Sequence, residues 1–228
     1  MSELADRLSL VQQKITQACA LAGRSEDEVC LVVVTKNHSE KLVLDLLQLG
    51  VRDFGENRDQ EAAPKSKALR EQTELDYRWH FIGQLQSNKA RSMLDYSAVL
   101  HSLDRESLLT ALIKETERAQ RSLDVFIQLN LTEDPNRGGI HPSNLESFAN
   151  LVLAQPRLNL LGVMGVASLD QPPEFDFELI QRASEKLVQL SPASHFISAG
   201  MSGDYEKAIE FGATHLRIGS AITGIRAA

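Results

Sequence analysis

The sequence predicts an α/β protein built as a single (β/α)8 TIM-type barrel with an extra N-terminal helix. Short apolar runs alternate with helical patterns eight times along the chain, and this alternation is typical of a parallel sheet. The connections are short, and 228 residues is within the usual range for such barrels. The alternative is an open, doubly wound sheet, but no GxGxxG follows the first strand to support its dinucleotide-binding version.

The strands are expected at the apolar runs. The first of them contains Leu31-Val32-Val33-Val34, with three β-branched residues in a row, which is typical of a strand buried on both faces. The predicted strand ranges are 30–35, 51–54, 79–82, 98–101, 124–130, 160–166, 195–198 and 214–218.

The helices are expected where apolar residues recur every three or four positions. Ser39 is a candidate N-cap for a helix that carries Leu42, Leu46 and Leu49, and Asp104 caps a later one. A Pro142-Ser143-x-x-Glu146 capping box opens another, and Pro64 is expected to break the third helix. The predicted helical ranges are 3–22, 39–50, 58–75, a short one ending at 93, 104–113, 142–153, 177–190 and 202–212.

Composition narrows the functional classes. The net charge is −7 with acidic and basic residues mixed throughout, which argues against a nucleic-acid binder with its basic stripe. The polar N-terminus is no signal peptide, and the longest apolar run is too short to cross a membrane. Cys19 and Cys30 lack a CxxC spacing, so we expect a reduced cytoplasmic protein without a disulfide framework or a zinc site.

Lys36 is the candidate anchor for a carbonyl compound, because it follows directly where the first buried strand ends. An amine held in a partly dry pocket is more often the neutral nucleophile that condenses with an aldehyde. We expect Lys36 to lie in such a pocket. The alternative is a surface lysine whose stem packs beside the strand.

Other polar and small residues also follow predicted strands. Sites in these barrels lie at the carboxyl ends of the strands, so we expect the residues there to share one face. They are Lys36, Asn57, Gly83, His101, Asn130, Met164, Ser198, Gly219 and Ser220.

Two turns on this face are suited to an anion. Gly219 lets the backbone approach a ligand, the N–H groups after it can point at an anion, and Ser220 adds a hydroxyl. The small, donor-rich turn Ser198–Asp204 comes from strand seven, and a phosphate behind strands seven and eight is the usual barrel arrangement. For each turn, an ordinary glycine turn with a helix cap is the alternative.

Arg217 precedes Gly219 by two residues, so both share one face of the strand and Arg217 points inward. Its partner is either a structural carboxylate or a ring nitrogen of a bound heterocycle. A guanidinium does not give up its proton, so it would keep such a ring nitrogen unprotonated. A heterocycle with an unprotonated nitrogen would be a poor electron sink.

The histidines on separate strands lack a metal-like i, i+4 pair and are interpreted as rim or packing residues. They are His80, His101, His195 and His215.

Several stretches spread over nearly the whole chain match one known family. They are Val34–Lys36, Phe54–Asn57, Trp79–Lys89, Ser198–Asp204 and Arg217–Ile222. Together they resemble the pyridoxal 5′-phosphate (PLP) homeostasis proteins, whose barrel is similar to the N-terminal domain of bacterial alanine racemases. The stretch 80–89 is the most specific of the five.

The resemblance implies a role for each candidate residue. Lys36 would hold PLP as a Schiff base, and Arg217 would face the pyridine nitrogen. Asn57 would line the pocket. The phosphate would be held by Ser198, Met201, Ser202, Gly219 and Ser220.

The resemblance further implies that residues 1–228 form a single PLP-binding barrel domain that buffers, delivers or senses PLP without catalysis. The alternatives are a PLP-dependent amino-acid racemase or other PLP enzyme and, third, a Schiff-base aldolase without PLP. Racemisation needs a second base on the opposite face of the cofactor. The resemblance implies that related racemases take that base from a C-terminal β-domain of the partner subunit, which this sequence, ending at Ala228, is expected to lack.

We therefore expect no catalytic residues, no bound metal and at most weak racemase activity. The expected partners are PLP and unidentified recipients, either PLP-dependent apoenzymes or a regulatory protein, with neither nucleic acid nor membrane involved. The protein is expected to be a cytoplasmic monomer.

Overall fold

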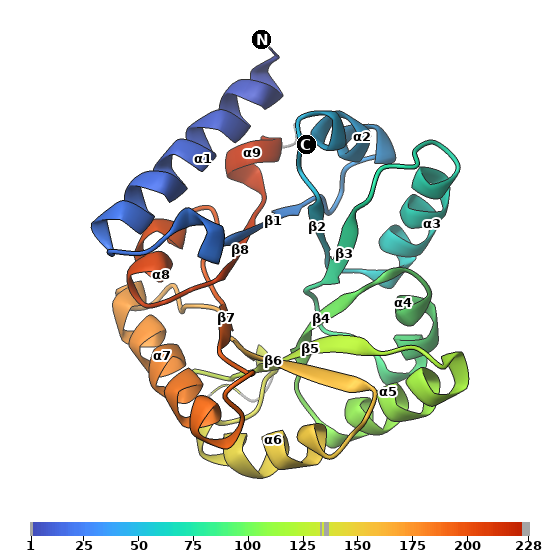
Figure 1. Cartoon of the computed structure of the whole chain (residues 1–228), viewed down its shortest axis with the longest axis vertical. Helices are drawn as coiled ribbons and strands as arrows, with labels where there is room; N and C mark the ends of the chain where they lie inside the picture. The colour runs from blue at the N-terminus through green and yellow to red at the C-terminus, as the bar shows by residue number, and fades with distance from the viewer. Residues whose placement is uncertain (1, 133, 135–136, 225–228) are drawn as a thin grey trace.

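Eight parallel strands close into a barrel that is surrounded by helices (Figure 1). This computed structural model describes residues 2–132, 134 and 137–224. Each strand pairs with the next in sequence, and the last pairs with the first, where Val33 lies opposite Ile218. The strands are β1 (Cys30–Val34), β2 (Asp53–Glu56), β3 (Arg78–Phe81), β4 (Val99–Leu103), β5 (Leu123–Gln128), β6 (Leu158–Met164), β7 (Phe196–Ser198) and β8 (His215–Ile218).

The helices connect consecutive strands, as the alternating pattern predicted. Short 3₁₀ helices cover Glu26–Glu28, Ser87–Lys89 and Pro142–Asn144. The α-helices are α1 (Glu3–Leu21), α2 (Glu40–Gln48), α3 (Asp59–Arg70), α4 (Ala90–Tyr96), α5 (Glu106–Ala119), α6 (Leu145–Leu153), α7 (Pro173–Leu190), α8 (Tyr205–Glu210) and α9 (Ser220–Thr223). The predicted (β/α)8 fold class is therefore confirmed.

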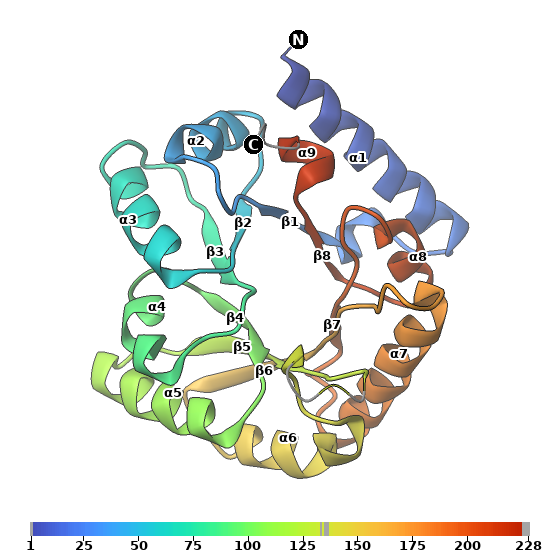
Figure 2. The ribbon, with the colours of Figure 1, turned by 180° about the vertical axis from the view of Figure 1, so that it is seen from behind.

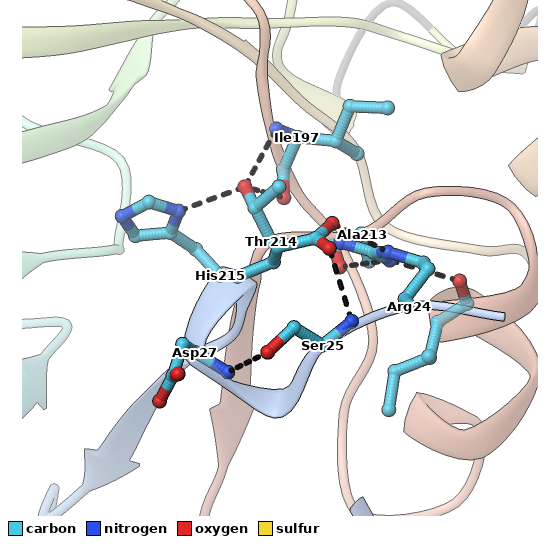
Figure 3. Close-up of polar contacts among 9 residues, drawn as sticks. Arg24, Ser25, Asp27, Ile197, Ala213, Thr214 and His215 are labelled. Atoms are coloured by element: carbon cyan, nitrogen blue, oxygen red, sulfur yellow. Dashed lines mark hydrogen bonds and ion pairs between the residues drawn. The ribbon is translucent and has the colours of Figure 1, made fainter. Parts of the chain in front are cut away.

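The extra helix α1 lies along α8 and α9 in both views of the ribbon (Figures 1 and 2). Arg7 fixes it there by donating from Nε to the Ile222 carbonyl at 2.7 Å. The segment after α1 is tied to the start of β8, because Arg24 donates to the Ala213 carbonyl at 2.8 Å (Figure 3). The apolar residues that recur every three or four positions and predicted this helix face the core: Leu8, Val11, Ile15 and Ala18 are buried, and Leu4 is partly buried.

The buried apolar side chains form two clusters. The larger cluster lies between strands and helices, where it includes Phe54, Leu100 and Ile127. A smaller cluster of Val99, Phe126 and Met164 is separate from it. No helix among the described residues is both long and apolar enough to cross a membrane.

Details of α2 and α3 differ from the prediction. The buried face of α2 is Val43, Leu46 and Leu47 rather than Leu42, Leu46 and Leu49, and Ser39 occupies the N-cap position without a side-chain cap. Pro64 lies inside α3 without ending it. An interior proline removes one helical hydrogen bond and clashes with the carbonyl four residues back, at a cost of about 3 kcal/mol. Burial of the α3 face that carries Ala62, Ser66 and Leu69 helps to offset this cost.

Other helix starts also differ from the predicted caps. Arg105, not Asp104, is the N-cap of α5, and Asp104 pairs with the Arg105 guanidinium instead. No capping box forms before α6, because a 3₁₀ turn intervenes and the His141 ring accepts from the Ser143 N–H. Strand β2 begins two residues later than predicted, at Asp53. Local side-chain choices of this kind are set by tertiary contacts that a sequence pattern does not contain.

Candidate functional site

The carboxyl ends of β1 and β8 meet beside each other and bring Lys36 and Gly219 onto neighbouring turns. A Cβ placed on Gly219 would lie 3.4 Å from Cβ of Val34, two residues before the lysine. The paired strands β1 and β8 therefore place the candidate amine and the candidate phosphate turn at one end of the barrel, as predicted.

Lys36 lies in a tight turn between β1 and α2. The turn closes when the His38 N–H donates to the Thr35 carbonyl at 3.1 Å, and Asn37 has a left-handed φ of 63°. The Asn37 N–H also donates to Glu61 on α3 at 3.0 Å. The Lys36 side chain is exposed, so the partly dry pocket expected from the sequence is not what surrounds it here.

A buried ionic group supports the residue before the lysine. Glu56 Oε1 accepts from the Thr35 hydroxyl at 2.7 Å and from Lys65 Nζ at 2.5 Å, and Lys65 also donates to the Thr35 carbonyl. Burial raises the pKa of Glu56, opposed by its bonds to Lys65 and Thr35. All three residues are buried, so β1, β2 and α3 jointly fix the backbone that leads into Lys36.

Two backbone donors converge at the turn after β8. The N–H groups of Gly219 and Ala221 both donate to Ser202 Oγ, each at 3.3 Å. Ser202 reaches them from the turn after β7, which is held by a bond from the Met201 N–H to Asp204 at 2.6 Å. Convergent N–H groups with a hydroxyl between them form a cradle of the kind that binds phosphate oxygens.

Arg217 is buried inside the barrel, as its position on the strand predicted. Its guanidinium donates from Nη1 to Ser198 Oγ at 2.6 Å and from Nη2 to the Gly165 carbonyl at 2.8 Å. Burial lowers its pKa to about 10, which leaves it charged at neutral pH. Among the described residues no carboxylate lies within ion-pair distance of it.

Arg217 begins a chain of hydrogen bonds that crosses the barrel interior. Ser198 Oγ lies 2.7 Å from His101 Nδ1, His101 Nε2 lies 2.9 Å from His80 Nδ1, and His80 Nε2 lies 2.9 Å from Asp53 Oδ1. We call Arg217, Ser198, His101, His80 and Asp53 the barrel relay. Burial lowers the pKa values of both histidines, while the contact with His80 helps to lower that of Asp53 to about 2.

The two ends of the barrel relay fix the direction of every bond in it. Arginine can only donate and an ionised aspartate can only accept. With both histidines neutral, each must therefore carry its proton on Nε2, and Ser198 must donate to His101 while it accepts from Arg217. The result is one directional path from Arg217 to Asp53.

The positions of His80 and His101 in this chain of hydrogen bonds differ from those predicted. His101 was expected at the rim, but β4 continues past it and the side chain is fully buried. His80 and His101 act as a bonded pair rather than as separate packing residues. The sequence could have indicated that both side chains face inward, because both residues lie on strands whose alternate side chains face the barrel interior.

The remaining predicted residues lie at the same end of the barrel. Asn57 is partly buried and borders a hollow of about 560 Å³ together with Gln84 and Lys89. Its backbone comes so close to Gly83 that a Cβ there would lie 2.2 Å from the Asn57 carbonyl oxygen. Ser220 is exposed at the first position of α9.

Comparison with known proteins gives consistent matches. The family described as "Alanine racemase, N-terminal domain" matches residues 7–227. The Escherichia coli K12 protein named "Pyridoxal phosphate homeostasis protein" is 34% identical over 229 residues, covering 99% of this chain and 98% of its own length. An Aquifex aeolicus protein of the same name is also 34% identical, over 97% of both chains.

Solved structures agree in fold. The structure of PipY from Synechococcus elongatus with PLP bound superposes with a TM-score of 0.84 at 29% identity, covering 97% of this chain and all of PipY. Alanine racemase from Corynebacterium glutamicum superposes at 0.66 with 14% identity over 62% of its chain, which shows a shared fold alone. Because full-length relatives share a third of their residues with it, the chain belongs to the pyridoxal phosphate homeostasis protein family.

Proposed function

We propose that this protein binds PLP at the carboxyl end of its barrel and serves PLP homeostasis without catalysing a reaction. The observation that carries the proposal is the buried Arg217, a charge with no carboxylate partner among the described residues, beside the N–H cradle of Gly219 and Ala221. A buried charge is costly without a counter-charge or acceptor. A phosphorylated pyridine supplies both an anion for the cradle and a ring nitrogen for an arginine.

Each part of the site has a task in this proposal. Lys36 would hold PLP as a Schiff base, since its amine and the aldehyde join with release of one water. The Gly219 and Ala221 N–H groups, with Ser202 and Ser220, would hold the phosphate, and Met201 would shape the turn that carries Ser202. Asn57 would line the pocket.

Ser198 receives a different role from the phosphate contact first expected. Its hydroxyl already donates to His101 and accepts from Arg217, so it positions the guanidinium. Arg217 then presents its charge to the pyridine nitrogen and keeps that nitrogen unprotonated. A pyridine of this kind withdraws electrons poorly, which favours storage of the cofactor over carbanion chemistry.

The relatives support this proposal in two ways. The proteins from E. coli and A. aeolicus are named for PLP homeostasis, and the PipY structure has PLP bound. The recipients we propose are PLP-dependent apoenzymes or a regulatory protein in the cytoplasm, and we propose that the protein acts there as a monomer.

The test compares Lys36→Ala with the wild type after incubation with PLP. We expect the wild type to absorb as a lysine-bound PLP and borohydride to fix the label on the Lys36 peptide, while Lys36→Ala loses both signals. Lys41→Ala is the matched control, because Lys41 is exposed on the neighbouring helix α2. Covalent label elsewhere than on Lys36 would refute the assignment.

The alternative is a PLP-dependent amino-acid racemase, which the shared fold with alanine racemase favours. One assay distinguishes a non-catalytic PLP-binding protein from a racemase. The PLP-loaded protein is incubated with L-alanine and other L-amino acids, and the D-enantiomer is followed by chiral chromatography. We expect turnover no higher than that of Lys36→Ala, whereas turnover that depends on Lys36 would establish the enzyme.

A further inference from the structure

We propose that Cys30, Asp53 and His80 form a binding site for a zinc-class divalent cation at the amino end of the barrel, opposite the PLP site. The three residues come from the adjacent strands β1, β2 and β3. One thiol sulfur, one carboxylate oxygen and one imidazole nitrogen all lie within 4.8 Å of one another. The proposal revises the expectation, drawn from cysteine spacing, that the protein has no metal site.

The donor set selects the metal. Zinc is bound by cysteine, histidine and carboxylate ligands, whereas the hard cations Ca²⁺ and Mg²⁺ are bound by oxygen alone. His80 Nε2 and Asp53 Oδ1 are already 2.9 Å apart. Tetrahedral zinc places its ligand atoms roughly 3.3–3.7 Å apart, and the three donor atoms here all lie within 4.8 Å of one another.

A hollow gives the metal access and a fourth ligand. Cys30 and Asp53 line a space of about 520 Å³ at the amino ends of the strands, and a water there would complete four-coordination. His215 lines the same space, but its Nδ1 is 3.0 Å from the Thr214 hydroxyl (Figure 3). Cys30 and Asp53 are partly buried and His80 is fully buried, which shields the metal from bulk water.

A divalent cation bound by the Cys30 thiolate and the Asp53 carboxylate would give an electrically neutral site. Asp53 also accepts from Arg78 Nε at 2.8 Å, and this arginine competes for the carboxylate. When the metal binds, the Cys30 thiol releases its proton to water. One thiolate and one carboxylate then neutralise the cation. Asp124 lines the same hollow as Arg78.

The barrel relay supplies a supporting contact for the imidazole. A metal-bound histidine usually donates its other N–H to a neighbour, which fixes the tautomer. His80 Nδ1 has such a neighbour in His101 Nε2 at 2.9 Å. Metal at His80 Nε2 moves the His80 proton to Nδ1. His101 must then accept at Nε2 and carry its own proton on Nδ1, facing Ser198.

The first test is a titration of the full-length protein with Co²⁺, a coloured substitute for zinc. We expect one equivalent to bind, with the visible bands of a tetrahedral site and a thiolate charge-transfer band. Cys30→Ser should abolish the charge-transfer band, and Cys30→Ser and Asp53→Asn should each weaken binding at least ~10-fold. Cys19→Ser is the matched control, because Cys19 is the other free cysteine and lies in α1.

The second test needs no variant that might disturb folding. Nitrogen-15 NMR of the imidazoles should show His80 and His101 as Nε2–H tautomers in the metal-free wild type and as Nδ1–H tautomers after addition of Zn²⁺. The proposal is wrong if the wild type binds no Co²⁺ or if Cys30→Ser keeps the charge-transfer band. It is equally wrong if Zn²⁺ leaves both tautomers unchanged. Neither test involves PLP, so its outcome is separate from that of the PLP proposal.

Discussion

At the residue scale, the proposed PLP site depends on side chains and N–H groups that neighbouring residues hold in position, as well as on Lys36. Arg217 is kept in place by Ser198 and by the Gly165 carbonyl. Ser202 Oγ keeps the Gly219 and Ala221 N–H groups pointed at one position. Such preorganisation reduces the entropy lost when a ligand binds.

Ser202→Ala tests the cradle. Without the hydroxyl, the turns after β7 and β8 lose their link and a phosphate loses one donor. Because a hydrogen bond to a charged group contributes about 1.5–3 kcal/mol, we expect PLP to dissociate roughly 10- to 100-fold more readily. Dialysis followed by absorbance of the retained PLP measures this. Ser220→Ala, at an exposed position, should have a smaller effect, and equal retention by Ser202→Ala and the wild type would remove Ser202 from the site.

At the scale of elements, turns at the carboxyl ends of the strands are held by contacts from neighbouring elements. The turn between β7 and α8 is the clearest case. Gly200 has a φ of 89°, and its carbonyl accepts from the Arg217 N–H at 2.9 Å. The turn therefore links the strand that carries Ser198 to the strand that carries Arg217, and its conformation depends on a glycine.

Gly200→Ala and Gly203→Ala form a matched pair within that turn. A Cβ on Gly200 would lie 2.8 Å from Ala208 Cβ and 2.9 Å from Tyr205 Cα, whereas a Cβ on Gly203 would have nothing within 4 Å. We expect Gly200→Ala to lower the free energy of unfolding by about 2–4 kcal/mol. Gly203→Ala should change it by less than about 0.5 kcal/mol. Urea denaturation of both variants measures the difference, and equal values would contradict the strain assigned to Gly200.

At the scale of the whole molecule, the barrel interior holds a group of histidines packed against Phe126. His80, His101 and His215 lie close together there, with ring centroids 5.1–6.3 Å apart. Burial lowers the pKa of each, that of His215 to about 3. The folded protein therefore keeps three neutral imidazoles between the strands.

Because these imidazoles stay neutral in the folded protein, the free energy of unfolding decreases as the pH falls. Below about pH 6.5 the unfolded chain takes up protons on these histidines that the folded protein does not. Their contribution is complete above that pH and is lost as the pH falls toward the folded pKa values. We expect the free energy of unfolding to fall by up to about 1.4 kcal/mol per pH unit for each histidine.

Urea unfolding between pH 7 and pH 4 measures this slope. His215→Phe should make it shallower, because one proton-binding group is gone and an aromatic ring still fills the cluster. His195→Gln is the control, since His195 is exposed and outside the cluster. A free energy of unfolding that stays constant down to pH 4 would contradict the burial of neutral histidines.

Much of this molecule follows from the sequence alone. The alternation of apolar runs and helical stripes predicts an α/β fold with a parallel sheet, because each strand and helix must bury its apolar face against the other layer, and eight such units in 228 residues favour a closed barrel. The two-residue period of a strand determines that Arg217 faces inward with Gly219. The positions of Lys36 and Gly219 at strand ends follow in the same way, since parallel strands end on one face.

The partners of those residues were decided only by the tertiary structure. The period of a strand says which face a side chain is on, but not which side chains of other strands it meets, because strand register and barrel closure set that. The packing of α3 on β2 brings Lys65 to Glu56, which also accepts from Thr35, and strand pairing joins His80 to His101. Register likewise places the Cys30 thiol beside Asp53 and His80, a cluster drawn from three strands that no spacing in the sequence reveals.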